Sequence, residues 1–354
     1  MSVLLETLEQ IRPQSSEWRQ KAKSRLDQLA LPHWALGRLM DLGLDLAGQT
    51  RSLHPNITRK AVITMAGDHG VAEEGVSKFP QDVTPQMVAN FVHGGAGINA
   101  LARQAGADVI VVDMGVAADL SVLAKAGKVI DKKVAFGTAN MAKGPAMSRE
   151  QAIQAVEAGI DVVRGLKDTY DLFGTGDMGI ANTTPSTAII AAVAGTAVED
   201  VTGRGTGLND EQLNLKITVI KKALEINQPD ASDGIDVLAK VGGFEIGGIA
   251  GVILAAAALR KPVVIDGFIS TAGALIAQSL VPQVTDYIIA AHRSVEQGHK
   301  IMQQHLGCQP LLDLNLRLGE GTGAALAMPI LDAAVRVLTE VATFGEAAVA
   351  QSDK

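Results

Sequence analysis

The 354-residue chain has little cysteine, few aromatic residues and no cluster of charges of one sign. A single cysteine, Cys308, excludes an intrachain disulfide and with it the small disulfide-stapled secreted folds. The 31 basic and 38 acidic residues give a net charge of −7 and are spread along the chain. Because nucleic-acid binding needs clustered Lys and Arg, this distribution argues against a nucleic-acid partner.

Long hydrophobic runs are also missing. The longest, Ile249–Leu259, is too short to cross a bilayer, so no membrane association is expected. The segment Met1–Gln20 has charged residues among scattered leucines and lacks the apolar centre of a signal peptide. The sequence therefore favours a cytoplasmic protein.

Glycine is abundant, with 37 residues, and apolar residues make up 47% of the chain. Leucines at three- and four-residue spacing predict a helical stretch up to about Ser52. From Lys60 onward, short apolar runs closed by Gly or Asp alternate with Ala-rich helical stretches, which indicates a parallel sheet covered on both faces. The predicted strands are Ala61–Met65, Val109–Asp113, Tyr170–Phe173, Val263–Asp266, Tyr287–Ala290 and Leu311–Asn315.

The helical stretches between these strands are also visible in the sequence. Ser148, with Gln151 three residues later, predicts a capping box at the start of one of them. The predicted helices are Pro85–Ala105, Arg149–Leu166, Thr187–Gly195, Ile249–Ala258 and Thr271–Ser279, with a further Ala-rich helical stretch from Gly323 to Ala350.

Polar residues collect where the predicted strands end. Because the carboxyl ends of parallel strands share one edge of the sheet, these segments are expected to form a ligand site there. They are Ala66–Gly70, Asp113–Val116, Gly174–Gly179, Asp266–Gly267, Ala291–Ser294 and Leu318–Gly323.

The segment Gly174–Gly179 fits the Gly-x-Gly-x-x-Gly pattern of dinucleotide-binding folds, and Glu199 follows at the usual distance. The stretch 196–205 is too short and too rich in glycine to be the second strand that such a site needs. A loop for a mononucleotide phosphate or ribose is favoured, because Asn182 and Thr183 follow at once as donors at a helix start. Ordinary turn glycines are the third alternative.

Two more glycine-rich segments are candidates for anion binding. Gly242–Gly248 leads directly into an apolar helix, which suits either an anion site or close helix packing. The loop Gly203–Gly207 supplies Arg204 and is followed by Lys216 on a predicted helix. Both cations are candidate phosphate ligands, although a lone helical lysine is more often solvated.

Glu320 stands between Gly319 and Gly321, just past a predicted strand. Glycines on both sides favour a working carboxylate over a solvated one, and burial would raise its pKa toward that of a general base. The histidines lack metal-ligand spacing, so no metal and no cofactor are expected.

Taken in order, several motifs resemble the family of nicotinate-nucleotide:dimethylbenzimidazole phosphoribosyltransferases, which make the lower-ligand nucleotide of cobalamin. The likeness spans nearly the whole chain. One departure is Asp177, where members of the family often have Glu. The motifs are Gly67–Val71, Phe79–Thr84, Asn90–Ala96, Lys143–Met147, Gly176–Thr184, Gly203–Gly207, Gly242–Ile246 and Leu318–Gly323.

The resemblance implies a Rossmann-like parallel sheet flanked by helices, with a small helical domain built from both chain ends, and a homodimer. The expected division is 1–58 and 323–354 for the helical parts and 59–322 for the α/β domain. It implies transfer of 5-phosphoribosyl from nicotinate mononucleotide to 5,6-dimethylbenzimidazole or a related base, with Glu320 as general base and Asp177 as a second catalytic carboxylate. We favour an orienting role for Asp177. The residues expected to bind substrate are Gln86, Gly176, Gly179, Asn182, Thr183, Gly205, Lys216, Ser294 and Gly319.

The chemistry agrees with these residues, since a benzimidazole that attacks C1′ must lose one ring proton and a single carboxylate base is sufficient. Two other functions remain open at this point. An NAD(P)-linked oxidoreductase rests on Gly174–Gly179 alone. A non-catalytic nucleotide sensor would not explain the glycine-flanked Glu320.

Overall fold

The computed structural model describes residues 2–205 and 207–350, and its centre is a six-stranded, fully parallel sheet. The strand order is β3-β2-β1-β4-β5-β6, so the direction of winding reverses between β1 and β4. This is the order of doubly wound, Rossmann-like sheets, and the predicted fold class is confirmed. The strands are β1 (Lys60–Gly67), β2 (Ala107–Gly115), β3 (Ile130–Asp131), β4 (Leu172–Met178), β5 (Val263–Ile265) and β6 (Ile288–Ala290).

The side chains of β1 show how both faces of the sheet are covered. All eight of its residues are buried. Ala61, Ile63 and Met65 belong to one hydrophobic cluster, whereas Val62 and Ala66 belong to the other. A strand buried on both faces needs a continuous apolar run, which is why this segment could be recognised in the sequence.

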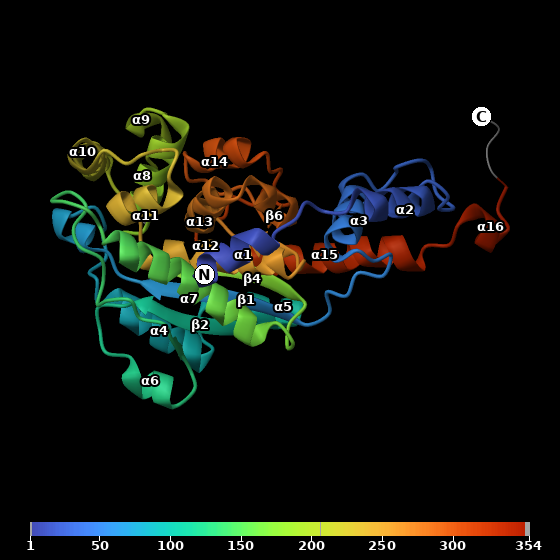
Figure 1. The fold of residues 1–354 in the computed structure, drawn as a ribbon, viewed down its shortest axis with the longest axis horizontal. Helices are drawn as coiled ribbons and strands as arrows, with labels where there is room; N and C mark the ends of the chain where they lie inside the picture. The colour runs from blue at the N-terminus through green and yellow to red at the C-terminus, as the bar shows by residue number, and fades with distance from the viewer. Residues whose placement is uncertain (1, 206, 351–354) are drawn as a thin grey trace.

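Helices form a layer on each face (Figure 1). The face of Val62 packs against α4 (Val83–His93), α5 (Gly97–Ala105) and the first half of α15 (Thr322–Glu340). The opposite face packs against α7 (Arg149–Leu166), α12 (Phe244–Ala258) and α13 (Phe268–Leu280), with α8 (Thr183–Ala194), α10 (Asp210–Asn227) and α11 (Gly234–Val241) beyond them. The shorter helices are α6 (Ser121–Lys125), α9 (Val198–Val201), α14 (His299–Leu306), η1 (Gly70–Glu74) and η2 (Pro282–Tyr287).

Helix α7 begins as the sequence predicts. The Ser148 hydroxyl accepts from the Gln151 N–H (3.2 Å), and the Gln151 side chain accepts from the Ser148 N–H (3.0 Å). The helix then crosses α12 at backbone contact, where a methyl group on Gly159 would overlap the carbonyl of Gly248. In the segment Gly242–Gly248 the glycines meet protein atoms, so the structure favours close packing over an anion site there.

A small helical lobe lies beside the sheet and is built from helices near both ends of the chain (Figure 1). Helices α2 (Ser16–Leu26) and α3 (Arg38–Thr50) pack against the last turns of α15, and α16 (Phe344–Ala347) follows. Helix α1 (Val3–Gln10) departs from the expected division at residue 58. It packs on α7 and α12, where the Leu4 N–H donates to Glu157 (3.0 Å). Residues 351–354 of the expected C-terminal part lie outside the described residues.

Two predictions about single elements are wrong, and one short strand was missed. Leu311–Asn315 is not a strand, because only Leu312 pairs with His292 in an isolated bridge. The predicted helix Pro85–Ala105 is divided into α4 and α5 by Gly94, whose φ of +78° ends α4. The two-residue strand β3 was not predicted, since so short a segment carries no periodicity.

Among the described residues, α15 is long and apolar enough to cross a membrane. It packs instead between the sheet and α3, with Ala324, Met328 and Leu331 fully buried. It is therefore a core helix of this fold.

Candidate active site

A cavity of about 270 Å³ opens at the carboxyl ends of β4, β5 and β6, next to the point where the winding reverses. The predicted convergence of polar strand ends is therefore observed for these three strands. Its wall combines apolar side chains with carboxylates, hydroxyls and one imidazole. The lining residues are Phe79, Asp177, Asn182, Thr183, Gly205, Gly267, Phe268, Ile269, His292, Ser294, Glu296, Arg317, Leu318 and Gly319.

Lys216 lies behind the cavity-lining Thr183 and Gly205, completely buried on α10. Its ammonium donates to the Thr183 hydroxyl (2.8 Å) and to the Gly203 carbonyl (3.3 Å). Gly205 has a φ of +51°, and a methyl group there would lie 3.1 Å from the Thr183 hydroxyl oxygen. Burial lowers the pKa of Lys216 to about 8, although Glu296 acts in the opposite direction. The result is a lysine whose charge is only partly compensated by the protein.

Arg204, the other cation predicted to bind phosphate, is occupied within its own loop. It donates to the Leu208 carbonyl (2.9 Å) and to the Asp210 carboxylate (2.5 Å). Arg317 lines the cavity instead. Thr206 of the same glycine-rich loop lies outside the described residues.

Asp177 is a buried carboxylate in the cavity wall, near the end of strand β4. One oxygen accepts from the Asn182 amide (2.9 Å), and the other has no hydrogen-bond partner among the described residues. Burial raises the pKa of Asp177 well above its ordinary value, and the negative charge of Asp266 raises it further. Gly319 packs against this carboxylate, since a methyl group there would lie 3.1 Å from both oxygens.

Glu320 follows the cavity-lining Gly319 and adopts a left-handed backbone conformation, with a φ of +64°. Its Oε2 accepts from the Ile98 N–H at the start of α5 (3.0 Å), and its carbonyl accepts from the Thr64 hydroxyl (3.0 Å). Burial raises the pKa of Glu320, and Asp266 adds to this effect. Gly176 leaves room for this arrangement, because a methyl group there would overlap the Glu320 backbone.

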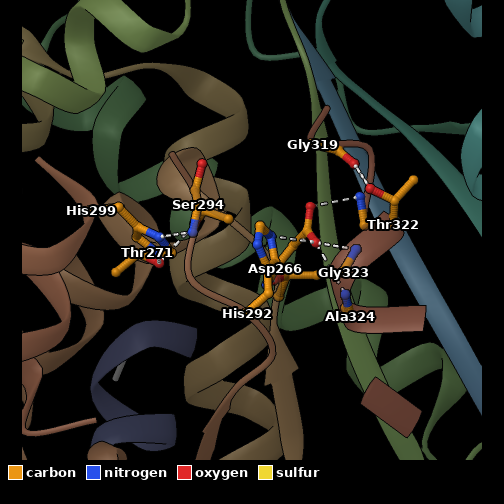
Figure 2. Close-up of polar contacts among 12 residues, drawn as sticks. Asp266, Thr271, His292, Ser294, His299, Gly319, Thr322, Gly323 and Ala324 are labelled. Atoms are coloured by element: carbon orange, nitrogen blue, oxygen red, sulfur yellow. Dashed lines mark hydrogen bonds and ion pairs between the residues drawn. The ribbon is translucent and has the colours of Figure 1, made fainter. Parts of the chain in front are cut away.

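Asp266 holds the loop that carries Glu320 (Figure 2). Its carboxylate accepts from the backbone N–H groups of Gly321 (3.0 Å), Gly323 (2.7 Å) and Ala324 (3.1 Å). The Nε2 atom of His292 lies 3.6 Å from the same carboxylate. Burial disfavours a charged His292, but Asp266 is close enough to raise the pKa of the imidazole overall.

A second imidazole fixes the backbone of Ser294 at the cavity wall (Figure 2). The Ser294 N–H donates to Nδ1 of His299 (2.8 Å), whose Nε2 contacts the Thr271 hydroxyl (2.9 Å). Burial lowers the pKa of His299 to about 3, so the ring is neutral. Because Nδ1 accepts, the ring proton lies on Nε2. The Ser294 hydroxyl accepts from the Glu296 N–H (3.3 Å) and keeps its own proton to donate.

Not every predicted site residue reaches this cavity. Gln86 is exposed on α4 and does not line it. Gly176 and Gly179 lie behind the wall, where a methyl group on Gly179 would overlap the Gly67 carbonyl. The others, Asp177, Asn182, Thr183, Gly205, Ser294 and Gly319, line the cavity, with Lys216 and Glu320 directly behind it.

Sequence reasoning missed Glu296, Arg317 and Phe268. Glu296 is the most informative of the three, because one of its oxygens is buried without a hydrogen-bond partner among the described residues. A carboxylate two residues past the Ala291–Ser294 strand end was the only signal in the sequence.

The polar residues at the carboxyl ends of β1 and β2 form hydrogen bonds and ion pairs with other parts of the protein. His69 Nε2 lies 2.8 Å from the Glu245 carboxylate at the start of α12, and Asp68 accepts from the Ala117 N–H (2.8 Å). Asp113 accepts from the Val116 N–H (2.9 Å) and pairs with Lys133 (2.9 Å). These groups hold loops around the sheet rather than facing the cavity.

The geometry also decides against the dinucleotide alternative. Gly174 and Gly176 lie inside strand β4, not in a turn after it, and they pack against Met328 and Glu320. A dinucleotide fingerprint needs these glycines in the loop that meets the pyrophosphate. They are packing glycines here.

Comparison with known proteins gives one consistent result. A family model described as phosphoribosyltransferase matches residues 11–349. The nicotinate-nucleotide–dimethylbenzimidazole phosphoribosyltransferases of Desulfotalea psychrophila and Syntrophotalea carbinolica are each 61% identical, over 100% and 99% of both chains. A crystal structure of CobT from Thermus thermophilus superposes with a TM-score of 0.90 at 44% identity, covering 95% of this chain and 100% of that one. The chain therefore belongs to the family of nicotinate-nucleotide–dimethylbenzimidazole phosphoribosyltransferases.

Proposed function

We propose that the protein transfers the 5-phosphoribosyl group of nicotinate mononucleotide to 5,6-dimethylbenzimidazole or a related base. The products are α-ribazole 5′-phosphate and nicotinate, which places the reaction in the assembly of the cobalamin nucleotide loop. The observation that carries the proposal is the arrangement of the cavity. A buried lysine, Lys216, lies behind one end, and the loop of Glu320 closes another part of its wall.

The phosphate is assigned to the Lys216 end. Lys216, Thr183 and the backbone of Gly205 are already in contact there, and Ser294 adds a hydroxyl. A phosphate dianion would restore the full charge of Lys216, because an anion favours the protonated amine. Charge-assisted contacts of this kind are worth about 1.5–3 kcal/mol each.

The azole is assigned to the apolar part of the wall. Phe79, Phe268, Ile269 and Leu318 offer flat and aliphatic surfaces suited to a bicyclic base. Phe79 and Leu318 are 51% and 60% exposed without a ligand, so a bound base would cover apolar surface that now faces water.

The reaction replaces one C–N bond by another at C1′. The bond to the pyridinium nitrogen of the nucleotide breaks, and its electron pair stays on nicotinate. An unprotonated nitrogen of the benzimidazole forms the new bond from the opposite face, which inverts β to α. The proton on its other nitrogen passes to Glu320, whose raised pKa makes it a competent acceptor.

Product analysis tests the proposal directly. The protein is incubated with nicotinate mononucleotide and, separately, dimethylbenzimidazole, benzimidazole, adenine and a phenol, and the products are separated by chromatography. Release of nicotinate together with a ribotide of an added base supports the transfer. Binding of the nucleotide without nicotinate release from any base would favour a nucleotide sensor.

We also propose a cytoplasmic homodimer, on the basis of the family resemblance. Light scattering of the purified protein measures the oligomeric state, and a monomer at micromolar concentration would contradict the dimer.

A further inference from the structure

We propose that Asp266 is a positioning residue for the transfer, because its carboxylate holds the loop Gly319–Ala324 in the geometry that presents Glu320. This inference rests on the proposed function. Asp266 is 1% exposed and comes directly after β5. It does not line the cavity, so it acts through the loop and not on the substrate.

The first support is the number of loop N–H groups that converge on one side chain. Gly321, Gly323 and Ala324 all donate to the two oxygens of Asp266. Helix α15 starts at Thr322, and its N-cap, Gly321, has no side chain to satisfy these groups. Asp266, 55 residues or more earlier in the chain, therefore supplies the cap that the local sequence lacks.

The second support is the strain in the residue that the cap fixes. Glu320 lies between two glycines with φ values of +82° and +98° and itself has a φ of +64°. A non-glycine residue with positive φ persists only where the surrounding contacts impose it. Thr64 holds the Glu320 carbonyl, Ile98 holds its carboxylate, and Asp266 holds the next N–H in the chain.

The third support is charge. Three ionisable groups lie around Asp266: His292 from the segment after β6, Asp177 from β4 and Glu320 from the loop Gly319–Ala324. From α5, the Ile98 backbone N–H contacts the Glu320 carboxylate. The negative charge of Asp266 raises the pKa of Glu320 beyond the effect of burial. Asp266 would therefore set both the direction in which Glu320 points and its affinity for the proton.

A plain structural cap is the competing explanation, and Asp113 provides the matched control. It is also a buried aspartate at a strand end that accepts a backbone N–H, but it lies at β2 and pairs with Lys133. Asp266→Asn and Asp113→Asn both remove one buried charge and disturb one loop. Only the first change should reach Glu320.

The experiment compares both variants with the wild type in three measurements. In Asp266→Asn, the amides of Gly321, Gly323 and Ala324 should exchange hydrogen faster. The kcat should fall by about 10²-fold, the usual effect of a misplaced catalytic group, with little change in the Kd for nicotinate mononucleotide. The acidic limb of the pH profile of kcat/KM should move to lower pH, since loss of the nearby negative charge lowers the pKa of Glu320. Asp113→Asn should show none of these changes.

A second variant, Asp266→Glu, keeps the charge but misplaces it. It should lose turnover without the pH shift, and it serves if Asp266→Asn fails to fold. Unchanged exchange at the three amides, or the same pH shift in Asp113→Asn, would overturn the inference. Wild-type turnover is measured first, so a failure of the proposed function appears there, whereas the exchange measurement needs no substrate.

Discussion

The ammonium of Lys216 lies 2.8 Å from the hydroxyl oxygen of Thr183, 33 residues away, in a completely buried position. Among the described residues no carboxylate lies within 4.0 Å of this ammonium, since the ion pairs found there do not include Lys216. A buried cation with only neutral contacts is costly, which explains why its pKa falls to about 8. Under the proposed function, the nucleotide phosphate offsets this cost by favouring the protonated amine.

The first prediction follows from that pKa. Above about pH 8 the free protein holds Lys216 mostly neutral, so binding of the nucleotide phosphate must take up a proton. The Kd for nicotinate mononucleotide should therefore rise with pH, approaching tenfold per pH unit when one proton is coupled to binding. Isothermal titration calorimetry in buffers of different ionisation enthalpy measures both the Kd and the proton uptake.

Lys216→Ala should weaken nucleotide binding at least several-fold, as expected for loss of a contact worth about 1.5–3 kcal/mol, and it should flatten the pH dependence. Lys221→Ala is the matched control, because Lys221 is on the same helix but exposed and paired with Glu199. A pH dependence that survives in Lys216→Ala would assign the proton to another group.

The second prediction concerns Glu320. Glu320→Gln keeps an oxygen for the Ile98 N–H but loses the proton acceptor. Turnover should fall by roughly 10²–10⁴-fold, the usual range for a general base, while nicotinate mononucleotide still binds. Steady-state kinetics with dimethylbenzimidazole measures the loss. Glu157→Gln is the matched control, because the Glu157 carboxylate also accepts a distant backbone N–H, that of Leu4. Its activity should be unchanged. Normal turnover in Glu320→Gln would remove this carboxylate from the mechanism.

Asp177 should limit stability at neutral and basic pH. Its folded-state pKa is raised, so the unfolded chain releases the proton first, and the folded protein loses stability as the pH rises from the ordinary aspartate pKa to that raised value. Asp177→Asn should therefore have a higher Tm than the wild type at pH 8, and the difference should shrink toward pH 4. Differential scanning calorimetry across this range tests the sign. A lower Tm at pH 8 would show that the charge is compensated in the folded state.

The role of Asp177 in turnover is a separate prediction. If it orients a substrate hydroxyl or Thr183, Asp177→Glu should lower kcat, because the longer side chain would press on Gly319, already within packing distance. Under this role Asp177→Asn keeps the titration seen in the wild-type pH profile. Loss of one limb of the profile in Asp177→Asn, with Glu320 intact, would make Asp177 the proton acceptor.

The crossing of α7 and α12 should be sensitive to a single methyl group. Gly159→Ala would overlap the Gly248 carbonyl and should reduce the free energy of unfolding by about 1–3 kcal/mol, the usual cost of overpacking. Gly165→Ala, in the same helix with no atom within 4 Å of the added methyl, should be neutral or stabilising by up to about 1 kcal/mol. Urea unfolding of both variants measures the difference. Equal stabilities would mean that the two helices move apart at little cost.

The parallel sheet, and the edge of the sheet at which the site lies, could be predicted from the sequence because both depend on local patterns. Strands buried on both faces leave continuous apolar runs, and polar residues such as Asp177 and Ser294 come at or just after their ends. Gly319 and Glu320 could be selected because a carboxylate between glycines has few structural explanations.

Other features depend on contacts that no local pattern contains. The burial of Lys216 follows from how α10 docks beside α8, and a helical lysine in sequence is indistinguishable from a solvated one. Asp266 caps a helix far along the chain, so no spacing rule connects the two. Leu311–Asn315 has the composition of a strand, but only Leu312 finds a strand-like partner, at His292.

Helix α15 gives the loop of Glu320 a second point of attachment, far from the reacting atoms. Its first residues carry the amides held by Asp266, and its last turns pack against α2 and α3 in the small helical lobe. At 1.5 Å per residue the 19-residue helix is roughly 28 Å long, and its middle is buried against the sheet. Substitutions that loosen the packing of the lobe therefore act on the same helix whose first residues are held by Asp266.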